Sequence, residues 1–99
     1  MGHKGDPKFL AALDELRELH LSKGGDYADL DDPLRNYTIS AKDNGIQAWR
    51  AAQLRFSEKY HRLINLSKDG REPNHESLDD TLLDLAALAL IIRSLRGRE

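Results

Sequence analysis

The chain has 99 residues and a formal net charge of −2, with an isoelectric point near 6.1, so no global basic field draws it to nucleic acid or to an anionic membrane. Its content of 39% hydrophobic and 32% charged residues is typical of a globular protein, and its length supports one domain with a modest core. The lack of cysteine excludes disulfides, thiolate zinc sites and thiol nucleophiles, and fits a reducing cytoplasm.

The N-terminal residues 1–5 are polar and no apolar segment follows them immediately, so we expect no signal peptide. The longest apolar run, Leu85 to Ile92, is far shorter than the ~20 residues of a membrane span. We therefore expect a cytoplasmic protein without a membrane partner, built as a single domain over residues 1–99 with a flexible N-terminus at 1–6.

The first predicted helix starts at Asp6-Pro7, where Asp is a suitable N-cap and Pro a suitable first helical residue. Apolar residues then recur at helical spacing until Lys23-Gly24-Gly25, where we expect the helix to end: Phe9, Leu10, Leu13, Leu16 and Leu19 or His20. Asp26 to Asp32 reads as an ordered loop.

Asp32-Pro33 repeats the start signal, which predicts a short second helix from Leu34 to about Lys42, stopped by Asp43-Asn44-Gly45. A third helix is predicted from Ile46 to Ser67 and a fourth from His75 to Arg96, ending at Gly97. The apolar stripe of the third helix is spaced three to four residues apart: Trp49, Ala52 or Gln53, Phe56, Tyr60, and Leu63 or Ile64.

No stretch alternates at period two, so the sequence predicts an all-α fold: a four-helix bundle in which the long third and fourth helices form an antiparallel pair. The fourth helix is apolar on every side in its second half. A single partner helix in so small a protein cannot cover all of this apolar surface. We expect it to be covered twice, once by its own chain and once by a second subunit. The alternative is that the first two helices wrap it completely.

Asp84 lies between Leu83 and Leu85 inside this apolar part, and a buried carboxylate is costly unless it is paired or bound to a metal. Helical spacing places Glu76, Asp80 and Asp84 on one stripe. Such oxygen ligands suit magnesium, or manganese in its place. A cation from the third helix is an equally good partner, and both readings stay open.

The third helix carries a charged stripe of Arg55, Glu58, Lys59 and Arg62. As a site, Glu58 would be a further metal ligand and the three cations would receive phosphate oxygens. The alternative is that the stripe is an ordinary solvent-exposed face. Its only interaction would then be a Glu58–Arg62 ion pair, which stabilises a helix by about 0.2–0.5 kcal/mol.

A third group of candidate site residues lies before the second predicted helix. In Lys23-Gly24-Gly25-Asp26-Tyr27 the glycines allow close backbone approach, Lys23 offers a charge and Tyr27 a stacking face. Asn36 could hydrogen-bond a base or a ribose. A plain helix-ending turn explains the same residues.

Taken in order, these segments resemble a known family: Lys23-x-x-Asp26-Tyr27, Asn36, Arg55-x-x-Glu58-Lys59-x-x-Arg62-Leu63 and Glu76-Ser77-x-x-Asp80-Thr81-Leu82-x-Asp84-Leu85-Ala86. The succession, over about residues 22–92, resembles small phage and bacterial proteins called nucleotide-modification-associated domains. These are similar to the all-α MazG-like nucleoside triphosphate pyrophosphohydrolases.

The resemblance implies a helical homo-oligomer, a dimer or tetramer, that cleaves a nucleoside triphosphate to the monophosphate and pyrophosphate with magnesium. Asp84 matches the Asp of the family's second metal motif, with Asp80 and Thr81 near the place of its Glu. The first motif departs, because Glu58-Lys59-x-x-Arg62 stands where the family has Glu-Glu-x-x-Glu.

The leading hypothesis is therefore a magnesium-dependent nucleotide pyrophosphohydrolase, in the host cytoplasm if the protein is phage-encoded. Its catalytic residues would be Asp84, Asp80 and Glu58, and its metal ligands would add Glu76 to them. The expected substrate contacts are Lys23, Asp26, Tyr27, Asn36, Arg55, Lys59 and Arg62. The alternatives are an inactive nucleotide-binding accessory protein, and a structural helical oligomer whose Asp84 pairs with Arg55 or Arg62. Nucleic-acid binding ranks last.

Overall fold

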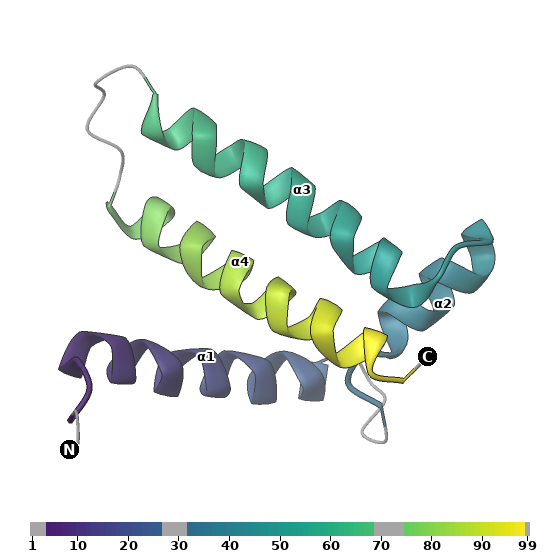
Figure 1. Cartoon of the computed structure of the whole chain (residues 1–99), viewed down its shortest axis with the longest axis horizontal. Coiled ribbons are helices and arrows are strands. Elements are labelled where there is room, and N and C mark those ends of the chain that lie inside the picture. The colour runs from purple at the N-terminus through teal and green to yellow at the C-terminus, as the bar shows by residue number, and fades with distance from the viewer. Residues whose placement is uncertain (1–3, 27–31, 69–74, 99) are drawn as a thin grey trace. The chain divides into compact units, whose positions relative to one another are not determined.

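The computed structural model describes residues 4–26, 32–68 and 75–98, and the side chains of 4–22, 32–68 and 78–98. Over these residues the backbone forms four helices and no strand (Figure 1), which confirms the all-α prediction: α1 (Pro7–Asp26), α2 (Arg35–Asn44), α3 (Ala48–Ser67) and α4 (His75–Arg96). The chain divides into two compact units, Met1–Pro33 and Leu34–Glu99, each described by itself. The prediction of one domain over the whole chain stays a prediction.

The first unit is the helix α1, and its start is the predicted one. The Asp6 carboxylate accepts a hydrogen bond from the backbone N–H of Phe9 (2.9 Å), and the Asp6 carbonyl accepts one from Leu10 N–H (3.0 Å). Asp6 is thus the N-cap, which satisfies an amide that the helix itself leaves unpaired.

The end of α1 differs from the prediction, because the helix continues through Gly24 and Gly25 to Asp26. Glycine lowers helix stability by about 1 kcal/mol relative to alanine but neither clashes nor lacks an N–H, so it does not force an end. Of the predicted apolar stripe, Leu16 is buried, while Phe9 and Leu13 are 64% and 45% exposed.

In the second unit, α2 begins at Arg35, one residue later than predicted, with Leu34 rather than Asp32 at the N-cap position. It ends at Asn44, two residues beyond Lys42 and within the predicted stop at Asp43-Asn44-Gly45. Gly45 follows as the C-cap, and its φ of 67° is a left-handed conformation that favours glycine. Ile46 N–H donates to the Ala41 carbonyl (3.0 Å), which completes the helix end. This turn leads into α3, two residues after the predicted start.

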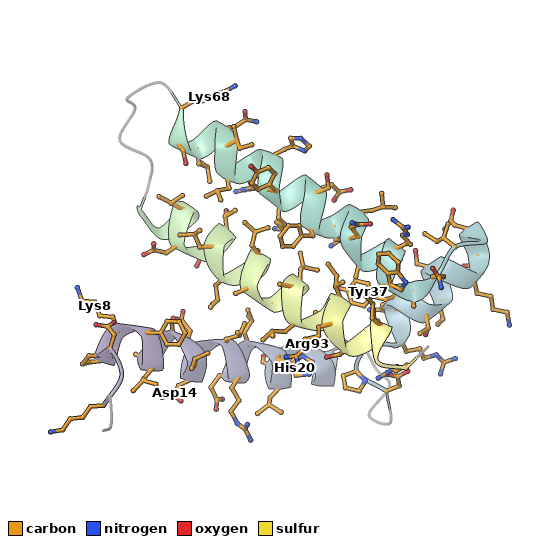
Figure 2. The ribbon with its side chains drawn as sticks, in the orientation of Figure 1. Lys8, Asp14, His20, Tyr37, Lys68 and Arg93 are labelled. Carbon is orange, nitrogen blue, oxygen red and sulfur yellow. The ribbon has the colours of Figure 1, made fainter. Side chains whose placement is uncertain are left out.

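The helices α3 and α4 run antiparallel and pack along each other, while α2 packs against α3 near the C-terminal end of α4 (Figure 1). This confirms the predicted antiparallel pair. Three buried residues form the core cluster of this unit, Leu34 just before α2, Ala52 on α3 and Leu95 on α4, at 6%, 0% and 1% exposure. Half-buried side chains pack around them: Tyr37 (Figure 2), Ala48, Trp49, Ile91 and Ile92.

The two faces of α4 have different environments. Towards α3, the buried residues are Thr81, Leu85, Leu88 and Leu95. On the opposite face, Ala86 and Ala89 are exposed, and Leu82 and Leu90 remain 46% and 50% exposed. Within the described residues of the second unit, α2 and α3 therefore leave this apolar face of α4 uncovered. None of the helices, as far as the structure describes them, has the length and apolar character of a transmembrane segment.

Candidate functional site

The carboxylate of Asp84, which we expected to need a partner, forms an ion pair with Lys59. Asp84 Oδ2 lies 3.0 Å from Lys59 Nζ, in an ion pair that joins α4 to α3. The two side chains are 25% and 35% exposed, so the pair lies at the edge of the helix–helix contact, where both groups keep some access to water. A cation from the third helix was one of the two partners considered for Asp84, and the structure shows this contact.

The hypothesis of a structural helical oligomer expected Asp84 to pair with Arg55 or Arg62, but its partner is Lys59. Arg55 and Arg62 are exposed, and neither is paired with Asp84. They lie four residues before and three residues after Lys59, so all three cations share one side of α3. Glu58 is exposed as well, and no Glu58–Arg62 ion pair forms between these two described side chains.

The residues proposed as metal ligands are partly described. Among the side chains that the structure describes, no three carboxylates or imidazoles lie close enough together to hold a metal ion. Asp80 is exposed one turn before Asp84, and Thr81 between them is buried at 2% exposure. The side chain of Glu76 lies outside the described residues. The described donors therefore do not fit a metal cage built by one chain alone.

Four further substrate contacts were predicted from the sequence: Lys23, Asp26, Tyr27 and Asn36. Asn36 is exposed on α2. Lys23 and Asp26 belong to the last turn of α1, but their side chains, like the whole of Tyr27, lie outside the described residues. Of the predicted site, the structure joins Lys59 to Asp84 and places Arg55 and Arg62 beside Lys59.

Two arginines approach the ring of Trp49 in the same unit, a contact that was not predicted from the sequence. The guanidinium carbon of Arg50 lies 4.1 Å from the centre of the Trp49 ring, and that of Arg96 lies 5.4 Å from it. Both distances are within the range of cation–π attraction. Arg50 also donates a hydrogen bond to Gln53 (3.3 Å). The adjacent Trp49 and Arg50 were the available sequence signal, but the approach of Arg96 from α4 depends on the packing of the hairpin.

In comparisons with protein-family models, with curated proteins and with solved structures, nothing matches this chain. The resemblance to MazG-like proteins therefore stays a prediction from the order of the motifs.

Proposed function

We propose that the chain is a MazG-like nucleotide protein. With magnesium, it would hydrolyse a (deoxy)nucleoside triphosphate: water attacks the α-phosphate, the α–β phosphoanhydride bond breaks, and the products are the monophosphate and pyrophosphate. The observation that supports this best is the contact between the two charged motifs. Lys59, from the motif on α3, meets Asp84, from the motif on α4, at 3.0 Å. The two segments that would share one substrate thus lie on facing helices.

The charges around this contact suit a triphosphate. Arg55 and Arg62 flank Lys59 on the same side of α3 and are exposed, so their guanidinium groups are open to an anion. Arginine binds phosphate oxygens in a bidentate manner, whereas lysine acts as a point charge. In the proposed complex, Arg55, Lys59 and Arg62 bind the phosphate chain.

Magnesium enters this proposal with the triphosphate, since the described side chains do not form a cage for it. A magnesium ion bound to phosphates needs only one or two protein carboxylates, and Asp84 and Asp80 would supply them. Such an ion neutralises phosphate charge. The chain's own part is to hold the carboxylate of Asp84 beside the cations of α3.

The direct experiment is a pyrophosphate-release assay with magnesium over a panel of ribo- and deoxynucleoside triphosphates. We expect turnover of at least one of them, lost in Asp84→Ala and retained in the control Asp14→Ala, which changes an exposed carboxylate of α1. Circular dichroism must show that Asp84→Ala keeps its helices. If no triphosphate turns over even at high protein concentration, the hydrolase proposal is wrong.

A second candidate, a nucleotide-binding accessory protein without hydrolysis, is favoured by the cation on Asp84. A carboxylate that already pairs with Lys59 has its charge compensated without a metal. This candidate predicts that triphosphates raise the melting temperature while no pyrophosphate appears. A purely structural helical protein would respond to neither nucleotide nor magnesium.

We also propose that the protein works as a homo-oligomer. The exposed leucines and alanines of α4 support this, because a helix that is apolar on both faces needs a partner on each.

A further inference from the structure

The exposed face of α4 has an unusual order of residues. Helical spacing places Asp79, Leu82, Ala86, Leu90 and Arg93 on one side of the helix, and all five are exposed. Arg93 projects from the side of α4 that faces away from α3 (Figure 2). These five residues form what we call the outer stripe.

The outer stripe is symmetric about Ala86. Leu82 and Leu90 lie four residues before and after it, and Asp79 and Arg93 lie seven residues before and after it. The sizes mirror each other, small at the centre and large on both sides, while the charges at the two ends are opposite. Such a surface is complementary to itself when a second copy is turned end for end.

We propose that α4 pairs with α4 of a second copy of this chain across a two-fold axis that passes near Ala86. In this antiparallel pair, Leu82 packs against the partner's Leu90. Asp79 faces the partner's Arg93, and symmetry repeats both contacts. This inference deepens the homo-oligomer proposal by naming the surface and its orientation, and it does not depend on nucleotide binding.

The chemistry of each position suits its place in the pair. Ala86, with its neighbour Ala89, lets the two helix backbones approach closely at the crossing point. Leu82 and Leu90, at 46% and 50% exposure, lose their remaining contact with water. The charged residues lie about 10 Å from the crossing along the axis, which is the rim of such a contact.

The helix dipole gives another reason for the same charges, because it favours Asp near the start of a helix and Arg near its end. That effect acts within one chain and does not require the two leucines to be equally far from Ala86. The two explanations differ in what happens when the charges are exchanged.

The first experiment uses the lack of cysteine in the chain. Ala86→Cys should form a disulfide-linked dimer on mild oxidation, because the two-fold axis brings residue 86 of both copies together. Leu54→Cys, at a 61% exposed position of α3, is the control and should stay monomeric on a denaturing gel. If Ala86→Cys links no more than Leu54→Cys, the proposed surface is wrong.

The second experiment tests the orientation. Sedimentation of the full chain measures the dimer dissociation constant, which Asp79→Arg alone and Arg93→Asp alone should each raise about tenfold, because two attractive rim pairs become repulsive. The double variant Asp79→Arg/Arg93→Asp should return to within about threefold of the original chain. Circular dichroism confirms that each variant keeps its helices.

Each other outcome contradicts the proposal. A double variant as weak as the single ones indicates a parallel pair or a dipole effect alone. A chain that stays monomeric at every concentration excludes the proposed pair of α4 helices. None of these results bears on pyrophosphate release, so this inference and the proposed activity can fail separately.

Discussion

Lys59 Nζ lies 3.0 Å from Asp84 Oδ2, and this ion pair ties α3 to α4 near the middle of both helices. Its position answers the question of why a carboxylate stands between two leucines. The carboxylate of Asp84 is directed to the edge of the helix contact, where a lysine with a long aliphatic stem reaches it. The pair is only partly shielded from water, at 25% and 35% exposure, and this sets its energetic value.

Replacing Asp84 by Asn should lower the free energy of unfolding by about 1–2 kcal/mol, between the values for an exposed and a fully buried pair. Lys59→Met should lower the free energy of unfolding by a similar or smaller amount, because the methionine side chain still packs where the aliphatic part of the lysine did. Urea denaturation measures both. The control Glu58→Gln, at an exposed position of α3 with no ion pair to Arg62, should stay within about 0.5 kcal/mol.

The double variant Lys59→Met/Asp84→Asn completes a thermodynamic cycle for the pair. We expect a coupling energy of about 0.5–1.5 kcal/mol, since each single change leaves the other charge without its partner. A coupling near zero would show that the two groups do not interact in solution.

Two leucines on opposite faces of α4 offer a matched comparison. Leu95 is 1% exposed and Leu90 is 50% exposed. Leu95→Ala should cost about 2–5 kcal/mol through lost burial and a cavity, and Leu90→Ala well under half of that in a dilute, monomeric sample. Equal losses in urea denaturation would mean that α4 is not oriented in this way.

The N-cap of α1 can be tested locally. Asp6→Ala removes the acceptor of the Phe9 N–H bond and should destabilise the first turn by about 1 kcal/mol, which raises amide hydrogen exchange several-fold at residues 8–10. Asp6→Ser should keep most of the protection, because serine also caps. Unchanged exchange in Asp6→Ala would contradict the cap.

Trp49 is the only tryptophan in the sequence, so its fluorescence reports on the corner where Arg96 approaches it. Arg96→Met should change its emission and lower the free energy of unfolding by about 0.5–1 kcal/mol. The control Lys42→Met, on the exposed side of α2, should leave the spectrum unaltered. Identical spectra for all three proteins would exclude the contact.

The helices could be predicted from the sequence because apolar spacing and the stop at Gly45 act locally, and the short connection between α3 and α4 predicted their antiparallel pairing. A cation from α3 was one of two partners that the sequence allowed for Asp84, the other being a metal ion. The sequence could not choose Lys59 over Arg55 or Arg62, since that choice depends on how far α3 is rotated about its axis. Ala51 and Ala52 are buried on α3, and such small residues give only a weak periodic signal in the sequence.

The end of α1 was missed for a different reason. Gly24 and Gly25 only weaken a helix, so their presence does not determine where it stops. The open face of α4 was partly anticipated from its apolar composition. The symmetric order of the outer stripe became visible only when the structure separated that face from the one on α3.

We propose that the cations of α3 and the carboxylate of Asp84 bind a nucleoside triphosphate with magnesium. This proposal is tested most directly by the melting temperature of the full chain, with and without magnesium, over a panel of triphosphates. We predict that at least one triphosphate with magnesium raises it by several degrees, as expected when a ligand is present far above its dissociation constant. The shift should be lost in Arg55→Gln/Arg62→Gln. A melting temperature that no triphosphate changes would contradict the account.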